Sequence, residues 1–288
     1  FFARSKGCNA NAVSEYVISA LLWITGKLNI NLEGKSLAVI GVGSVGQKVI
    51  EKAKTLGLDL LLSDPPLESM DHKYYFTSFE NCLNADFITF HVPLTFNGPF
   101  KTFDLIGKRE LSKIRDSSII INTARGSVIN ELSLIEKPIK GIVIDCWDNE
   151  PNINYSLLKK VDIATPHIAG HTYEGKYNGS ITVQKALCKY LNIDDKKIFK
   201  YKSHFMPKII EIDATRNSDV EILREIVFKC FPINNNNIEK NMSFSKENRI
   251  KNHFISLRKN YPLRYEWNNY SIKLINGSDR LKQKINTL

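Results

Sequence analysis

Three short motifs in the middle of the chain carry side chains that could take part in chemistry. They are Asn122-Thr-Ala-Arg125-Gly126, Asp145-Cys-Trp-Asp-Asn-Glu150-Pro151 and Thr165-Pro-His167-Ile-Ala-Gly170. Each lies at the end of an apolar run, and an open parallel sheet places its ligands at the ends of its strands. The planar guanidinium of Arg125 suits a carboxylate held by two hydrogen bonds, and the adjoining glycine allows a ligand to approach closely. Alone, Arg125 is equally compatible with a structural ion pair.

A glycine-rich turn lies upstream of these motifs. Gly41-Val-Gly43-Ser-Val-Gly46 follows an apolar run and opens a helical pattern. Gly41 allows a tight turn, Gly43 lets the backbone approach a pyrophosphate, and Gly46 lets helix and strand pack closely. Amides at the helix start, including those of Ser44 and Val45, supply donors and positive potential for phosphate. Because glycines in such a turn could serve geometry alone, the motif needs a second signal.

Asp64 supplies that signal. It ends the second apolar run, 18 residues after Gly46, where a carboxylate can accept hydrogen bonds from the adenosine ribose hydroxyls. A 2'-phosphate would be repelled there, and Ser63-Asp-Pro-Pro66 offers no nearby Arg. The sequence therefore favours NAD over NADP as the cofactor. The alternative is that Asp64 only starts a turn before Pro65.

The elements that position these residues follow from the apolar pattern. Runs apolar enough to be buried on both faces alternate with helical segments, which predicts right-handed crossovers in a parallel sheet. The runs are Leu37–Ile40, Leu58–Leu62, Phe87–Phe90, Ile119–Ile121, Gly141–Ile144 and Asp162–Ala164. We therefore predict an α/β fold with a doubly wound parallel sheet over residues 31–170.

Helices and a small tail flank this domain. Apolar residues at helical spacing predict a long amphipathic helix from Asn11 to Leu28 and a second long helix from about 171 to 191. The tail reads as strand 209–212, helix 220–231, an Asn-rich loop at 234–237, a helix ending near Leu257 and strand 270–275. The predicted divisions are 1–30, 31–170, 171–198 and 199–288.

The ordered motifs resemble those of the D-2-hydroxyacid dehydrogenases. The glycine-rich turn, the strand-end Asp64, His91-Val-Pro-Leu94, Ala124-Arg-Gly126 and the two later motifs stand in that family's order. The resemblance implies a Rossmann NAD-binding domain and an NAD-dependent oxidoreductase acting on a 2-hydroxy acid. It implies that Arg125 binds the substrate carboxylate and that His167 exchanges the proton of the 2-hydroxyl. Glu150 would stand behind that histidine and support it. It adds Val92, Asp145 and Gly170 to the cofactor pocket.

The chemistry is consistent with these implied roles. A hydride leaves C2 for a nicotinamide only if the hydroxyl proton is removed as well, so a base that titrates near neutral pH must lie within hydrogen-bond reach. A histidine is the natural group, and a neighbouring carboxylate fixes its tautomer. A single histidine before an Ile-Ala-Gly turn is otherwise more often structural.

Further features resemble one branch of the family, which acts on a phosphorylated hydroxy acid and carries an extra C-terminal dimerization domain. They are Gly7-Cys-Asn-Ala10, Ser63–Pro66, Asn97–Thr102, His167–Gly175, Leu257-Arg-Lys-Asn-Tyr261 and Glu266-Trp267. The resemblance implies a homodimer formed by residues 199–288. It also places His171 at the substrate, where the branch has a Tyr. Because the sequence begins close to a helix and not with Met, we expect the N-terminal segment of the substrate domain to be missing.

The composition limits the classes of protein to which the chain could belong. With 43% hydrophobic residues, the chain can bury the hydrophobic cores of a globular protein. Its net charge of +10 arises mostly after residue 199, where there are 17 Lys and Arg but 9 Asp and Glu, and these residues form no nucleic-acid-binding motif.

No signal peptide, membrane span or metal-binding cysteine pair is indicated, and the five cysteines are expected to be free thiols. We predict a cytoplasmic enzyme with a small-molecule substrate, no metal, no nucleic-acid partner and no membrane partner.

Two alternatives remain from the sequence. Other members of the family, of the 3-phosphoglycerate or glyoxylate type, share the arginine, glutamate and histidine and differ mainly in specificity. The chain could also be a binding module that retains NAD binding without catalysis.

Overall fold

The architecture centres on a six-stranded parallel sheet. The computed structural model describes residues 1–70, 74–194, 207–215, 217–236 and 249–288. The strands stand in the order β2-β1-β3-β4-β5-β6, so that the predicted parallel α/β sheet is confirmed. Their bounds are β1 Ser36–Ile40, β2 Asp59–Ser63, β3 Phe87–Phe90, β4 Ile119–Asn122, β5 Gly141–Ile144 and β6 Ile163–Ala164.

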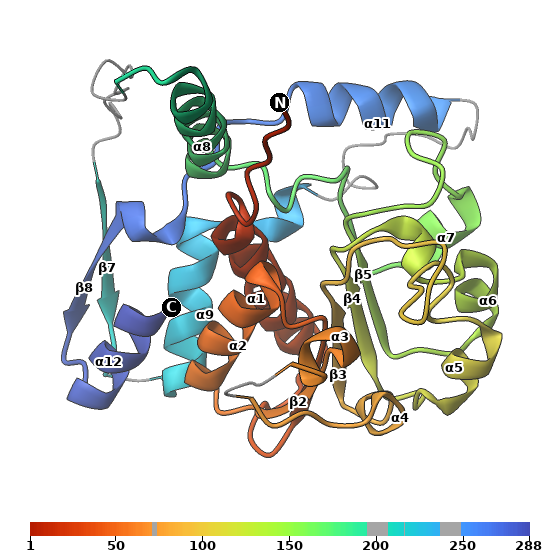
Figure 1. Ribbon diagram of the computed structural model, residues 1–288. Helices are drawn as coiled ribbons and strands as arrows, with labels where there is room; N and C mark the ends of the chain where they lie inside the picture. Colours follow the sequence, from red (N-terminus) through yellow and green to blue (C-terminus); the bar gives the residue numbers. More distant parts are fainter. Residues whose placement is uncertain (71–73, 195–206, 216, 237–248) are drawn as a thin grey trace.

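The sheet is buried on both faces because helices cover each face, and successive side chains of a strand point into opposite cores. In β1, Leu37 and Val39 pack into one hydrophobic core, whereas Ala38 and Ile40 pack into another. The first core is closed by α1 (Ala10–Lys27), α2 (Ser44–Thr55) and α9 (Asp219–Cys230). The second is closed by α5 (Lys108–Lys113), α6 (Glu131–Glu136), α7 (Tyr155–Lys160) and α11 (Ile250–Lys259). Figure 1 shows α1, α2 and α9 on one side of the strands and α5, α6 and α7 on the other, with α11 across the top.

Helix α1 differs from the prediction of an amphipathic helix. It is buried on almost every side, and its buried residues include the polar Ser14, Glu15 and Ser19. The reason is long-range packing, because α2, α9 and a C-terminal segment around Trp267 cover the side that the sequence pattern leaves to solvent. Helix α1 is therefore a central element of the molecule.

The remaining elements lie at the periphery. Short helices α3 (Pro65–Glu68) and α4 (Phe79–Cys82) follow β2, and the long helix α8 (Tyr173–Leu191) follows β6. Strands β7 (Lys208–Asp213) and β8 (Tyr270–Ile275) form a separate parallel pair beside α12 (Asp279–Thr287), at the left of Figure 1. Of the Asn-rich loop expected at 234–237, residues 234–236 belong to a 3-10 turn, Ile233–Asn236, and residue 237 lies outside the described part.

The buried carboxyl group of Glu15 ties α1 to the C-terminal segment. It accepts hydrogen bonds from the Asn11 side chain and the Trp267 backbone amide, both at 2.9 Å. Burial raises the pKa of Glu15 from 4.5 to about 8, although Arg264 and Lys52 oppose the shift. The neutral form is therefore the one that the folded protein stabilises at neutral pH.

Replacing Glu15 by Gln should change how stability depends on pH. Because the folded-state pKa of Glu15 is raised, its contribution is fully present below pH 4.5 and is lost as the pH rises towards 8. Glu15→Gln is neutral throughout and should lose less stability across this window, as measured by urea unfolding. Glu33→Gln, at an exposed position, is the matched control. A Glu15→Gln profile parallel to that of the parent would contradict this assignment.

Candidate active site at the strand ends

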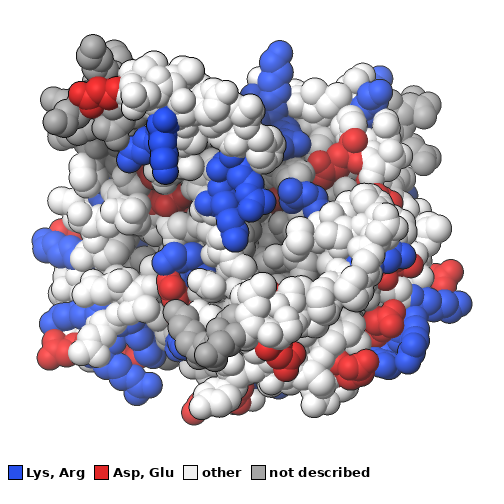
Figure 2. All heavy atoms as spheres, in the orientation of Figure 1, with Lys and Arg blue, Asp and Glu red and all other residues white. Residues whose placement is uncertain are grey.

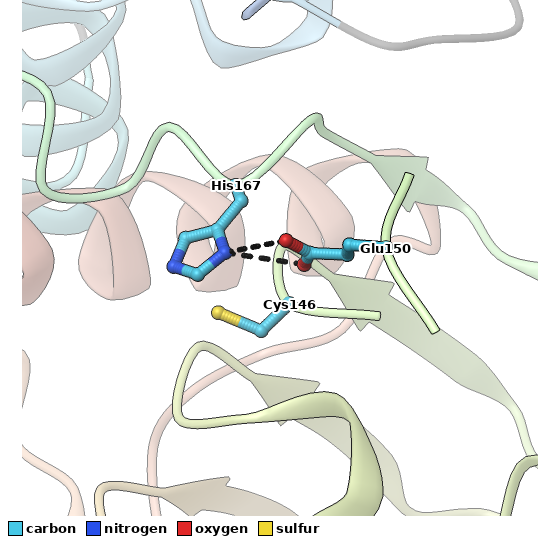
Figure 3. Close-up of side chains that lie close together, drawn as sticks. All are labelled: Cys146, Glu150 and His167. Carbon is cyan, nitrogen blue, oxygen red and sulfur yellow. Dashed lines mark hydrogen bonds and ion pairs between the residues drawn. The ribbon is translucent and has the colours of Figure 1, made fainter. Parts of the chain in front are cut away.

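The candidate site is built around a histidine and a glutamate. His167, just after β6, directs its Nδ1 at Glu150, with 2.8 Å to Oε2 and 3.1 Å to Oε1. Figure 3 shows the pair, with the second ring nitrogen of His167 pointing away from Glu150. The carboxylate is itself oriented by the Trp147 amide, which donates to Oε1 at 2.8 Å. In the neutral ring, a carboxylate beside Nδ1 favours the tautomer with its proton on Nδ1, which leaves the other ring nitrogen as an acceptor.

The turn that carries His167 is held by Asp145. One oxygen of this buried carboxylate accepts from the Thr165 hydroxyl at 2.6 Å and the Ile168 amide at 2.7 Å, and the other accepts from the Ala169 amide at 3.0 Å. The Asp145 carbonyl also accepts from the His167 amide at 2.9 Å. His167 thereby adopts a left-handed backbone with φ of 56°, which is uncommon for a residue with a side chain. Burial raises the pKa of Asp145, although these hydrogen bonds and His167 oppose the shift.

Arg125 lies at the end of β4 on the same edge of the sheet. Its side chain is exposed, and one guanidinium nitrogen donates to the Ala124 carbonyl at 2.6 Å. Asn122 fixes the loop through hydrogen bonds to the Arg125 carbonyl and the Ala124 amide. Gly126 has a different role from the expected one, because a Cβ there would lie 1.9 Å from the Trp147 carbonyl carbon. The glycine thus lets two loops of the site pack together, instead of making room for a ligand.

The glycine-rich turn has the shape that a dinucleotide requires. A Cβ on Gly41, whose φ is 93°, would lie 2.8 Å from the His91 carbonyl carbon, and one on Gly46 would lie 2.1 Å from the Gly41 oxygen. Beside Gly43, in contrast, the space is open, with nothing within 4 Å of a built Cβ. Helix α2 starts at Ser44 without a side-chain cap. The open space and uncapped amides fit a pyrophosphate approaching the backbone.

Asp64 lies beside this turn. Its contacts are compatible with both roles that the sequence allowed, the start of a turn before Pro65 and an acceptor for the ribose. Its carboxylate accepts from the Val42 amide at 2.8 Å and, as the N-cap of α3, from the Leu67 amide at 3.0 Å. It therefore does start a turn before Pro65. Since each oxygen has a second lone pair, the same carboxylate can still accept from a ribose hydroxyl. Val92 also borders the turn, because its amide is 2.9 Å from the position of a Gly41 Cβ.

His171 lies between the turn that carries His167 and the C-terminal segment around Tyr261. Its amide donates to the Ile168 carbonyl at 2.9 Å, and its ring meets that of Tyr261 edge-on, with centroids 6.2 Å apart. The pKa of His171 is lowered to about 4, mainly by burial and then by the positive charges of Arg258, Lys176, His167 and Arg264. Gly170, beside it, packs against the Asn9 side chain.

Two side chains at the site were not given roles by the sequence. Cys146 is a buried free thiol whose sulfur lies beneath the His167 ring in Figure 3. Ligand atoms of Cys146, Glu150 and His167 lie within 4.8 Å of one another, so they are of a kind that can hold a metal ion. Burial raises the pKa of the Cys146 thiol, although the charges of Arg125 and Arg258 oppose the shift. Arg258, on α11, places its Nη1 3.8 Å from Glu150 Oε2. In the sequence, the motif around Arg258 indicated only a dimerization domain.

Comparison with known proteins agrees with this geometry. The family model for the D-isomer specific 2-hydroxyacid dehydrogenase NAD binding domain matches residues 15–169. An erythronate-4-phosphate dehydrogenase of Hydrogenovibrio crunogenus is 39% identical, with 92% of this chain and 70% of the relative aligned. One from Ruthia magnifica is 36% identical over 95% of this chain and 75% of its own length.

Solved structures show the same fold. The NAD-dependent formate dehydrogenase of Staphylococcus aureus in complex with NAD has a TM-score of 0.56 and 26% identity, covering 69% of this chain and 68% of its own. The D-lactate dehydrogenase of Lactobacillus jensenii with NAD+ has a TM-score of 0.54 and 22% identity, covering 67% and 69%. No helix in the described part of the chain is long and apolar enough to cross a membrane.

Asp145→Asn should destabilise the turn of His167. Asparagine has one oxygen that can accept a hydrogen bond, in place of the two of the carboxylate. Its NH2 group would therefore face the Thr165 hydroxyl or an amide of the turn, each of which now donates to Asp145. A lost buried hydrogen bond of this kind costs about 1–3 kcal/mol of unfolding free energy. Urea denaturation should show this loss, whereas Asp116→Asn, at an exposed position, should change little. Equal stability of the two variants would mean that Asp145 does not hold the turn.

Proposed function

The chain belongs to the D-isomer specific 2-hydroxyacid dehydrogenase family, and we propose that it oxidises 4-phospho-D-erythronate at C2 to 2-oxo-3-hydroxy-4-phosphobutanoate. It is an NAD-dependent oxidoreductase that acts on the CH–OH group of a 2-hydroxy acid. The proposed substrate is supported by relatives named erythronate-4-phosphate dehydrogenase, which are 33–39% identical over most of this chain. The reaction would be an early step towards pyridoxal 5'-phosphate, or vitamin B6.

The observation that carries the proposed chemistry is the contact between His167 and Glu150. Glu150 holds Nδ1 at 2.8 Å, so Nε2 keeps its lone pair and points away from the carboxylate. In oxidation, Nε2 accepts the proton of the C2 hydroxyl, and Glu150 stabilises the imidazolium that forms. NAD, when bound, accepts the hydride from C2. In the reverse direction His167 returns the proton.

Arg125 is proposed to bind the substrate carboxylate. Only one contact of its guanidinium, to the Ala124 carbonyl, is made within its own loop. The exposed remainder of the fork can form two parallel hydrogen bonds to a carboxylate. This would orient C2 between His167 and the cofactor, which lowers the entropic part of the barrier. His171, four residues after His167, is proposed to contact the substrate as well.

The residues around the glycine-rich turn are proposed to hold NAD. The pyrophosphate would lie over Gly41, Gly43 and Gly46 and accept from the amides of Ser44 and Val45. Asp64 would accept from the adenosine ribose, since its carboxylate already borders the turn. Val92, Asp145 and Gly170 would line the nicotinamide end.

We further propose a role for each of the four divisions of the chain. Residues 1–30 would contribute to the substrate domain and form an interdomain helix, 31–170 would bind NAD, 171–198 would form a return helix, and 199–288 would form a dimerization domain. The last boundary lies outside the described residues. Analytical ultracentrifugation tests the proposed homodimer. The cytoplasmic location stays a prediction.

The function is tested by offering several hydroxy acids to the chain with NAD. The absorbance of reduced nicotinamide is followed with 4-phosphoerythronate, 3-phosphoglycerate and glycerate in parallel. Turnover confined to 4-phosphoerythronate is the expected result. Preference for another acid would overturn the proposed substrate and retain the family chemistry. NAD binding without turnover of any acid would support a binding module instead.

His167→Gln should reduce kcat by about two to four orders of magnitude, because a general base usually contributes this much. Glutamine keeps a polar side chain at the position but cannot take the hydroxyl proton. NAD affinity, measured by calorimetry, should stay near the parent value and show that the fold is intact. A variant with nearly parental kcat would remove His167 from the proton-transfer step.

Asp64→Ala should weaken NAD binding far more than substrate binding. The change removes the proposed ribose acceptor together with the contacts that hold the Val42 and Leu67 amides. The expected loss is about 10-fold or more in NAD affinity, as one charged hydrogen bond is worth roughly 1.5–3 kcal/mol. Asp59→Ala, at the exposed start of the same strand, should bind NAD normally. Equal affinity in both variants would refute the ribose assignment.

A further inference from the structure

We propose that Arg258 of α11 binds the phosphate group of the substrate and so selects phosphorylated over unphosphorylated hydroxy acids. The inference rests on the proposed function, because it assigns a residue to the second anionic group of that substrate. The two anionic ends would then be held by different arginines, the carboxylate by Arg125 and the phosphate by Arg258. These arginines come from segments far apart in the sequence.

Helix α11 is fixed against the NAD-binding domain. Ile250 and Phe254, which are 3% and 2% exposed, belong to the hydrophobic core that closes one face of the six-stranded sheet. Leu257 packs against the same core. Figure 1 shows the helix crossing above the domain, away from the β7–β8 pair. Because apolar packing fixes the helix, it also fixes the point from which the Arg258 side chain extends, beside Glu150.

Arg258 points at the catalytic pair. Its Nη1 lies 3.8 Å from Glu150 Oε2, the same oxygen that His167 Nδ1 contacts at 2.8 Å. This separation is longer than a hydrogen bond, and the Arg258 side chain is 39% exposed. A guanidinium has five N–H donors on a rigid fork, so one edge can face Glu150 while another binds a phosphate.

The surroundings of Arg258 suit an anion. The positive charges of Arg258, Lys176 and Arg264 act together on His171, and Figure 2 shows basic side chains across the upper half of this face. Of these, Arg264 is buried and donates to the carbonyls of Ala12 and Ala169. Lys176 is exposed at the start of α8, without a contact to the catalytic pair among the described residues. Arg258 is thus the one that combines proximity to Glu150 with available donors.

A groove borders both Glu150 and Arg258. It has a volume of about 410 Å³ and is lined by Glu150, Pro151, Phe254, Ile255, Arg258 and Lys259. Its lining thus includes two cations from α11, Arg258 and Lys259, and one carboxylate, that of Glu150. A phosphate in this position would form charge-assisted hydrogen bonds, whereas the hydroxyl of an unphosphorylated acid would leave the arginine with a weaker partner.

The test compares Arg258→Gln with Lys251→Gln, an exposed position on the same helix that removes the same charge away from the groove. For each full-length variant, kcat/KM is measured with 4-phosphoerythronate and with erythronate. Calorimetry then measures binding of 4-phosphoerythronate to the enzyme with NADH. Arg258→Gln should lower kcat/KM and affinity for the phosphorylated acid by roughly 10- to 100-fold. It should change kcat/KM for erythronate less than threefold, as should Lys251→Gln for both acids.

The outcomes separate this inference from the proposed function. An equal loss with both acids would overturn it, since Arg258 would then act through Glu150 alone. Unchanged binding of 4-phosphoerythronate by Arg258→Gln, or an equal loss in Lys251→Gln, would overturn it as well. Arg258-dependent binding without turnover by the parent chain would support the phosphate site and contradict the proposed reaction. Absence of binding by the parent chain would overturn both.

Discussion

The buried carboxylate of Asp145 is the group on which the candidate site depends. It lies just after β5 and accepts from the Thr165 hydroxyl and from two amides of the turn after His167. The Thr165 hydroxyl, having donated to Asp145, accepts from the hydroxyl of Tyr16 at 2.6 Å, so that α1 joins the same network. A carboxylate removed from water is stable only when its oxygens are satisfied in this way. The network thus requires the turn, and the turn places His167 where Glu150 can hold it.

The C-terminal segment braces this arrangement from outside the NAD-binding sheet. Arg264 donates to carbonyls of α1 and of the His167 turn, so one buried guanidinium joins three parts of the chain. Glu266 accepts from Asn11 at 2.7 Å and from Thr172 at 3.2 Å, at the start of α8. The segment that resembles a dimerization domain therefore also supports the site within one chain, and α11 adds Arg258 to the catalytic carboxylate.

The sequence predicted those features that are local in the chain. All six strand runs agree with the structure to within one residue at each end, because burial on both faces leaves an apolar run that no surface helix shows. The glycine turn was also predictable from its spacing, although only the close approach of Gly46 to the Gly41 oxygen lies within one strand–turn–helix unit, and Gly41 itself packs against the backbone of His91. Asp64 was ambiguous because a ribose acceptor and a helix cap need the same carboxylate at the same position.

The features that the sequence missed arise from contacts between distant segments. The burial of α1 depends on the C-terminal segment, the need for glycine at position 126 depends on the backbone of Trp147, and the role of Arg258 depends on the packing of α11. No periodicity within one segment reports such contacts.

The most direct test of the account is a crystal structure of the chain with NADH and 4-phosphoerythronate, a pair that cannot react in the oxidative direction. The account predicts the C2 hydroxyl within hydrogen-bond distance of His167 Nε2, with Glu150 still on Nδ1 and the substrate carboxylate on Arg125. A hydroxyl bound to another side chain, or a His167 ring turned away from Glu150, would contradict it.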